Sequence, residues 1–390
     1  MVTTSRASSP EDEQRPRPTA PARPDLSAHL EIHVATVNVK NDGDRAKPIP
    51  IPEHGAIPPT ERGYWVGTYD QLPWAERRSR LVDALLGTGP LDIVGFQEVY
   101  HNQLMDFAQL LGPTYAHVGV GRDDGAKAGE YSCIFYDRTK FEEIKWKTIW
   151  LSPTPDVPGS KGWDADCVRI ATFLSLRMKV TGEVLYVINT HYDHRGFQAR
   201  AESSRMIREH AFEWVTAVEE ELGLVDKHRG PVILMGDLTD PTRTDSHPEM
   251  DGYLLLTSPK PLPSGKPSFT FVDSYTHLKA RSLQSTDPRQ SGPYGPAHTF
   301  TDFQPPGCKW TERIDFIMIA STKLPSDDGG SVDQHGQAGT TDRPVGRGGW
   351  EVARYACVDN FVEGDADGWV GRWSDHRAVR ATFAKAEAPP

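Results

Sequence analysis

Hydrophobic residues recur along the chain with two different periods. In residues 30–39 every second position is apolar and β-branched residues are frequent, which predicts a strand. Residues 73–87 place Leu81 and Leu85 at helical spacing and end at a glycine, which predicts a helix with a C-terminal cap. Residues 92–98 are again apolar over a short run, which predicts a buried strand.

The same alternation continues to the C-terminus. It predicts further helices at 102–111 and 198–222, and further strands at 132–136, 170–179, 185–190, 231–235, 313–319 and 378–383. Helices that alternate with strands, together with strands that follow one another directly, indicate a layered α/β domain with mixed sheets. The sequence shows no internal repeat and no break in composition between 28 and 386, so these residues are expected to form one domain.

The segments outside this pattern differ in composition. Residues 1–27 contain five prolines and almost no large apolar side chain, so a disordered tail is expected there. Residues 41–70 are rich in glycine and proline and are expected to form a loop. Residues 257–307 contain nine prolines and 321–350 contain seven glycines, which predicts two long loops that line a site or are disordered.

Composition and charge narrow the class of protein. Hydrophobic residues at 37% and charged residues at 25% are typical of a globular domain with a buried core. The net charge of −11 argues against nonspecific coating of nucleic acid, because that affinity comes mainly from Lys and Arg on phosphates. It leaves open a phosphorylated substrate, either nucleic acid or a small phosphoester, that is held locally by a metal ion.

Cysteine spacing and hydropathy bear on the compartment. The four cysteines lack metal-ligand spacing and are expected to be buried thiols, with no zinc site or disulfide: Cys133, Cys167, Cys308 and Cys357. No apolar run approaches the roughly 20 residues of a membrane span, and no signal sequence follows Met1. An intracellular protein, cytoplasmic or nuclear, is therefore expected, and no protein partner can be inferred.

Polar residues gather at the ends of the predicted strands. They are Asn38; Gln97 and Glu98; His191, Asp193 and His194; Asp237 and Thr239; and, before the last strand, Asp375 and His376. Any one of them is ordinary, because turns and helix caps use the same residues. Strand ends converge at one rim of a layered α/β fold, so the whole set predicts a shared hydrolytic site.

The residue types favour one chemistry. Oxygen ligands from Asn38, Glu98 and Asp375 suit a hard cation, Mg²⁺ or Mn²⁺. Such an ion beside carboxylates and histidines suits hydrolysis of phosphate esters, with a carboxylate that orients or deprotonates water. Asp315 has two open interpretations: it either orients a catalytic group or is a strand-end acid paired with Arg313.

These motifs, in this order, resemble the endonuclease/exonuclease/phosphatase superfamily with the deoxyribonuclease-I-like fold, over nearly all of residues 30–385. The markers are Asn38, Gln97-Glu98-Val99, the run 189–194, the run 236–239, Arg313-Ile314-Asp315 and Ser374-Asp375-His376. The resemblance implies an α/β fold that is a four-layered α/β sandwich, with two mixed β-sheets packed face to face between helices.

The resemblance also implies roles. Glu98, Asn38 and Asp375 would hold the divalent ion. Asp237 and Thr239 would position and activate the water, while His191 and His376 would contact the phosphate and Asp315 would hydrogen-bond to His376. Segments such as 121–125, 129–136 and 190–196 resemble one poorly characterised microbial and fungal branch. We expect substrate contacts from Tyr131, Arg169, Asp193 and His194, and Arg122 and Arg195 are further candidates. Arg and Tyr at the bases of loops often only tie loops together, and for Arg122 this structural interpretation is favoured.

The chain departs from the family pattern at Thr239, where the family usually has Asn. Thr offers one hydroxyl in place of an amide, and loss of one well-placed donor can cost about 2.7–4 kcal/mol of transition-state stabilisation. The leading interpretation is a metal-dependent phosphodiesterase, nuclease or phosphatase. The alternatives are a 3'-5' RNA exonuclease similar to deadenylases, and a catalytically weakened ligand-binding protein on the same fold.

Overall fold

The computed structural model describes residues 30–41, 71–239, 248–278, 293–304, 306, 312–321 and 346–385. The expected tail at 1–27, nearly all of the expected loop at 41–70 and most of the loop at 321–350 lie outside these residues.

Two six-stranded sheets form the centre of the molecule. The first sheet has the order β11 (Trp350–Val358), β14 (Ala378–Lys385), β1 (Glu31–Asn38), β2 (Ile93–Val99), β4 (Tyr131–Asp137) and β3 (Tyr115–Val118). The second has the order β5 (Phe141–Trp150), β6 (Ile170–Met178), β7 (Val184–His191), β8 (Arg229–Asp237), β10 (Asp315–Ala320) and β9 (Phe271–Asp273). A separate two-stranded ribbon pairs β12 (Phe361–Glu363) with β13 (Val370–Arg372).

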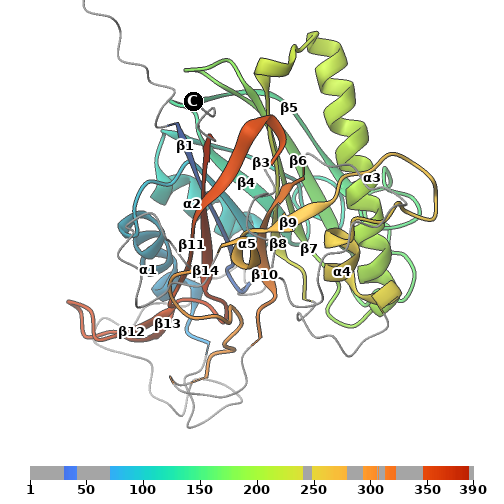
Figure 1. Ribbon diagram of the computed structural model, residues 1–390. Coiled ribbons are helices and arrows are strands. Elements are labelled where there is room, and N and C mark those ends of the chain that lie inside the picture. The colour runs from blue at the N-terminus through green and yellow to red at the C-terminus, as the bar shows by residue number, and fades with distance from the viewer. Residues whose placement is uncertain are drawn as a thin grey trace, which may run out of the picture.

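Each six-stranded sheet contains one parallel pair joined by a helix. β1 and β2 are connected through α1 (Trp74–Gly87), and β7 and β8 through α3 (Phe197–Leu222). The other helices are α2 (His101–Leu111), α4 (Gly252–Thr257) and α5 (Ser274–His277). In Figure 1, α1 and α2 cover one side of the molecule and α3 covers the opposite side, with the two sheets between them.

Three hydrophobic clusters hold these layers together. One lies between the two sheets and includes Val34, Leu185 and Ile317. A second packs α3 against the outer face of the second sheet, and a third packs α1 and α2 against the first. The predicted four-layered α/β sandwich with two mixed sheets face to face is therefore confirmed.

The predicted helices and strands are found within a few residues of their expected bounds, but several strands were missed. β5 is a sheet edge with two exposed glutamates and two half-buried lysines. This composition hides the strand pattern and protects an edge from further pairing. β11 and β3 are the outer strands of the first sheet. The segment 257–307 also contains β9 and α5, so it is not loop throughout.

The cysteine expectation is only partly correct. Cys133 and Cys357 are buried thiols, but Cys167 is partly exposed at a loop, and Cys308 lies outside the described residues. None of the described helices is long and apolar enough to cross a membrane.

One buried arginine ties α1 to the loops at one end of the first sheet. Arg77 is fully buried, and its guanidinium donates to the backbone carbonyls of Leu72, Val39, Lys40 and Trp373 at 2.7–2.9 Å. The loop after β1 and the loop before β14 are thereby fixed relative to each other.

Replacing Arg77 with Met should therefore lower the free energy of unfolding by about 3 kcal/mol, because four backbone carbonyls, three of them buried, lose a charged donor. Urea denaturation followed by circular dichroism measures the change. The neighbouring Arg78→Met serves as the control: Arg78 makes an exposed ion pair with Asp106, and its loss should cost at most about 1 kcal/mol. Equal effects of the two variants would contradict the role given to Arg77.

Candidate active site

The side chains that face the space between the sheets change from apolar to polar at one end of the sandwich. Along β1 the order is Ile32, Val34, Thr36, Asn38, and along β7 it is Leu185, Val187, Asn189, His191. β8 and β10 follow the same rule, because Ile233 and Met235 precede Asp237, and Asp315 precedes Ile317 and Ile319. Since strand side chains alternate between faces, the end of the core becomes the floor of a polar site.

A layer of amides separates this site from the apolar core. The Gln97 amide donates to Thr36 Oγ1 at 2.9 Å and to Asn189 Oδ1 at 2.6 Å. Asn189 in turn donates to the backbone carbonyls of Phe96 and Cys133 in the other sheet. Gly95 leaves the space that this requires, because a Cβ there would lie 2.8 Å from the Asn189 side chain. The two sheets are thus cross-linked directly beneath the site.

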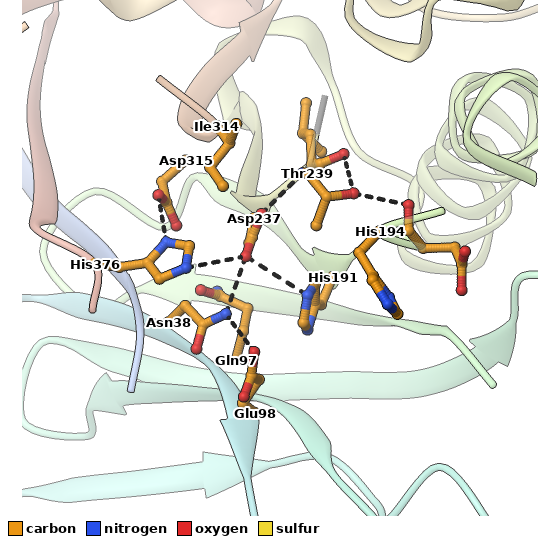
Figure 2. A network of polar contacts seen from close by, with 12 residues as sticks. Asn38, Gln97, Glu98, His191, His194, Asp237, Thr239, Ile314, Asp315 and His376 are labelled. Atoms are coloured by element: carbon orange, nitrogen blue, oxygen red, sulfur yellow. Dashed lines mark hydrogen bonds and ion pairs between the residues drawn. The ribbon is translucent and has the colours of Figure 1, made fainter. Parts of the chain in front are cut away.

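The Asp237 carboxylate lies at the centre of the site, as Figure 2 shows. Its Oδ2 accepts a hydrogen bond from Asn38 Nδ2 at 2.9 Å and lies 3.5 Å from His191 Nε2 and 3.7 Å from His376 Nε2. The pairing of β8 with β7 and β10 places Asp237 opposite His191 on one side and Asp315 on the other. The structure thus brings together Asn38, His191, Asp237, Asp315 and His376.

Burial and Arg169 together determine the protonation of His191. The Arg169 guanidinium donates to His191 Nδ1 at 2.8 Å, and because guanidinium is only a donor, Nδ1 is the acceptor. Burial, followed by the charges of Arg169 and Arg122, lowers the pKa of His191 well below its ordinary value. The imidazole is therefore neutral, with its single proton on Nε2, directed toward Asp237 Oδ2.

In contrast to His191, His376 carries a positive charge. Its Nδ1 donates to Asp315 Oδ2 at 2.8 Å. Burial alone would lower the pKa of His376, but the negative charges of Asp315, Asp237 and Asp375 outweigh burial and raise it to about 10. This geometry favours the interpretation of Asp315 as the partner of His376, because Arg313 pairs instead with Asp273 at 2.7 Å.

The carboxyl group of Asp237 has a raised pKa. Burial and then the charge of Asp315 raise the pKa of Asp237 to about 7, against the lowering effects of His376 and Asn38. A carboxyl group that titrates near neutrality, beside one neutral and one charged imidazole, can take up and release a proton at physiological pH.

The two predicted metal-binding carboxylates face one cation position. A bulge in β2 and a positive φ of 59° at Glu98 turn its side chain into the site. Asp375 approaches from the loop before β14. Lys40 Nζ lies 3.9 Å from Glu98 Oε2 and 3.5 Å from Asp375 Oδ2, so both carboxylates converge on a single positive charge.

This donor set fits a divalent ion. Glu98 stays ionised because Lys40 and then Asn38 outweigh the effect of burial and lower its pKa to about 2. Asn38 contributes less directly: its Nδ2 donates to Glu98 Oε1 at 3.0 Å, and its Oδ1 accepts from Lys40 N. Glu98 and Asp375 therefore match a hard cation, while Asn38 as a ligand remains a prediction.

Thr239 contributes its backbone to the site. Its N–H donates to Asp237 Oδ1 at 2.8 Å, which fixes the carboxylate from the side opposite Asn38. Its hydroxyl lies 2.8 Å from the carbonyls of both Asp193 and Leu238, and the single hydroxyl proton is used there. The residue has φ of 49°, a region that β-branched residues rarely adopt.

The four predicted substrate-binding residues surround His191, and all have protein partners. Tyr131 is 3% exposed and its hydroxyl donates to the Ala126 carbonyl. Asp193 accepts from four backbone N–H groups, at 166 and 167 and at 195 and 196. A cavity of about 10 Å³ beside His191 is lined by Arg122, Glu130, Tyr131, Ser132, Val168, Arg169 and Ile170. Their contact with substrate stays a prediction.

The Asp193 turn also arranges an exposed group at the rim. It holds the 166–167 loop against the 193–196 turn, which places ligand atoms of Asp166, Cys167 and His194 within 4.8 Å of one another. Arg169 and Arg195 also approach this group, at 3.5 Å from His194 and 3.6 Å from Asp166.

Three residues of the site were missed from the sequence. Lys40 faces Glu98 and Asp375. The Asn41 amide donates to Glu98 Oε2 at 2.8 Å and to Glu130 Oε1 at 3.1 Å. Glu130 also accepts a hydrogen bond from Arg122. Lys40 has a positive φ beyond the end of β1, so strand alternation gives no signal for it. Glu130 lies in a glycine-rich turn that likewise carries no signal.

Comparisons with known proteins agree with this fold. The sequence matches the family model described as the Endonuclease/Exonuclease/phosphatase family over residues 35–376. No curated protein matches the sequence.

Solved structures of bacterial proteins resemble the whole described fold. An endonuclease/exonuclease/phosphatase protein from Bacteroides vulgatus has 26% identity and a TM-score of 0.60, with 91% of this chain and 99% of that chain covered. An endonuclease/exonuclease/phosphatase family protein from Bacteroides thetaiotaomicron has 27% identity and a TM-score of 0.60, with coverage of 92% and 99%. A mannosyl-6-phosphatase from Bacteroides thetaiotaomicron has 26% identity and a TM-score of 0.59, with coverage of 90% and 99%.

The charge coupling around Asp237 predicts a specific pH response. Activity should rise as Asp237 loses its proton and fall as His376 loses its own, so kcat/KM should be bell-shaped. Asp315→Asn removes a negative charge that raises both pKa values, so both limbs should move to lower pH. The pH profile of kcat/KM measures this. Asp359→Asn, at an exposed ion pair, should move neither limb, and a fixed profile in Asp315→Asn would disprove the coupling.

The positive φ of Thr239 predicts the effect of two substitutions. Asn tolerates this region better than a β-branched residue, so Thr239→Asn should keep or raise kcat and raise the unfolding free energy by about 0.5–1 kcal/mol. Thr239→Ala loses the bond to the Asp193 carbonyl and should lower kcat. Steady-state kinetics and urea unfolding test both variants. If both match the parent, Thr239 has no role beyond its turn.

Proposed function

The chain belongs to the endonuclease/exonuclease/phosphatase family, whose members hydrolyse phosphate esters, and from this premise we propose that it is a phosphoester hydrolase dependent on Mg²⁺ or Mn²⁺. The observation that carries the proposal is the environment of Asp237. Its Oδ2 is contacted by Asn38 and faces two imidazole Nε2 atoms, next to two carboxylates that converge on one cation position.

Glu98 and Asp375 would hold the divalent ion, which would neutralise charge on the phosphoryl oxygens. Asp237 would orient the attacking water and accept its proton as the new P–O bond forms, which is consistent with a pKa near neutrality. Asn38 and the Thr239 N–H would keep the carboxylate in place.

The two histidines would interact with different oxygens of the phosphate ester. Neutral His191, with its proton on Nε2, would donate a hydrogen bond to a non-bridging phosphoryl oxygen. Charged His376 would stabilise the negative charge that develops as the ester bond breaks, and Asp315 would keep its ring in place. Arg169 would act on the reaction through His191.

Within this class, a small sugar phosphate is the better-supported substrate. One of the similar structures is that of a mannosyl-6-phosphatase, and the likeness extends over 90% of this chain. The net charge of −11 gives no long-range attraction for a polyanion. Cleavage of DNA or RNA, including a deadenylase-like activity, and a catalytically weakened binding protein are the competing possibilities.

A substrate panel tests the proposal. Purified protein should hydrolyse hexose 6-phosphates faster than bis(p-nitrophenyl) phosphate, poly(A) or duplex DNA; EDTA should abolish hydrolysis and Mg²⁺ or Mn²⁺ should restore it. Glu98→Gln should lose about 100-fold or more in kcat, because one carboxylate of the cation position becomes neutral.

Glu142→Gln is the matched control, since Glu142 is an exposed residue on the edge strand β5, and it should retain parent activity. Full activity in EDTA would exclude the metal-dependent mechanism. Preference for poly(A) over every monoester would replace the sugar-phosphate assignment, and no hydrolysis of any substrate would favour the binding protein.

A further inference from the structure

Lys40 is held in an unusual backbone conformation beside the cation position. Its φ is 55°, in the left-handed region that a lysine rarely adopts. The backbone on both sides is fixed: Lys40 N donates to Asn38 Oδ1 at 3.0 Å, and its carbonyl accepts from Arg77 at 2.9 Å and from Gln103 at 3.4 Å. Buried groups from β1, α1 and α2 thus define the direction in which this side chain leaves the chain.

The Lys40 side chain points between two carboxylates. Lys40 Nζ lies 3.5 Å from Asp375 Oδ2 and 3.9 Å from Glu98 Oε2, and these carboxylates are 5% and 12% exposed. Two nearly buried carboxylates that face each other repel unless a positive charge lies between them. The ammonium supplies that charge, at the position where the proposed function requires a divalent ion.

We propose that the Lys40 ammonium is an internal counter-ion that occupies the cation position between Glu98 and Asp375, and that a divalent ion binds by displacing it. This inference rests on the metal site of the proposed function. Because the backbone of Lys40 is fixed, displacement proceeds by rotation of the side chain alone. The Lys40 side chain is 35% exposed, so the ammonium has a path to solvent.

The proposal makes metal binding an exchange of cations. Mg²⁺ gains two carboxylate ligands but must first break two ion pairs, so its affinity is lower than the carboxylates alone would give. Without the ammonium, Glu98 would keep the neutral amide donors of Asn38 and Asn41, and Asp375 the His376 ring at 4.0 Å. The metal-free protein would then contain a poorly compensated pair of negative charges and would be less stable. Lys40 therefore stabilises the fold without metal at the expense of metal affinity.

Chemical modification tests displacement directly and needs no substrate. Reductive methylation followed by peptide mass spectrometry should modify Lys40 several-fold faster in Mg²⁺ than in EDTA, because the released ammonium reaches solvent. Lys227, which is exposed at the opposite end of β8, serves as the internal control and should react at the same rate in both. Equal rates at Lys40 in Mg²⁺ and EDTA would overturn the proposal.

Calorimetric titration with MgCl₂ provides the second test. Lys40→Met should bind Mg²⁺ on the order of tenfold more tightly than the parent, which corresponds to about 1.4 kcal/mol. In EDTA the same variant should melt at a lower temperature than the parent, whereas Lys40→Arg, which keeps the charge, should resemble the parent in both measurements. Lys227→Met should change neither.

The outcomes separate this inference from the proposed function. If the parent binds Mg²⁺ and Lys40→Met binds it equally or more weakly, the counter-ion role is wrong while the metal site stands. If Lys40→Met binds more tightly but is as stable as the parent in EDTA, its effect is only long-range charge and the proposal is overturned. If neither protein binds Mg²⁺ or Mn²⁺, the metal site of the proposed function fails as well.

Discussion

The Asp237 carboxylate connects the two halves of the sandwich, because it belongs to the second sheet and accepts a hydrogen bond from Asn38 of the first. A buried negative charge is costly unless donors and positive charge surround it. Here the backbone N–H of Thr239 and the ring of His376 supply part of that environment. Asp315 opposes it, and the result is a carboxyl group with its pKa near neutrality.

The same constraint explains the unequal histidines. Both rings direct Nε2 toward Asp237, yet their other nitrogen faces opposite charges: a guanidinium at His191 and a carboxylate at His376. One imidazole is neutral and the other is charged, although both are buried. The site therefore contains a neutral and a charged imidazole next to each other. The difference comes from Arg169 and Asp315, which contact the two rings at Nδ1, on the side away from Asp237.

Much of this arrangement could be predicted from residue order. Polar residues at the ends of apolar strands identified Asn38, Glu98, Asp237 and His376, and the family resemblance identified the sandwich. The prediction failed where the signal was not periodic. Lys40 enters the site through a left-handed backbone past the end of β1, and β5 was disguised by charged residues on a sheet edge. Glu98 was predicted, but the β-bulge that turns its side chain into the site was not.

The sequence by itself determined which strands are buried and which of their ends carry polar groups, because alternation along a strand is a local property that hydrophobicity records. Only the tertiary structure decided which charges meet. The placement of Lys40 between Glu98 and Asp375 and of Arg169 on His191 joins residues that are distant in sequence. The Asp315–His376 contact is equally long-range, and it was expected only from the family resemblance. The protonation of these groups depends on distance and burial, which exist only once the two sheets have packed together.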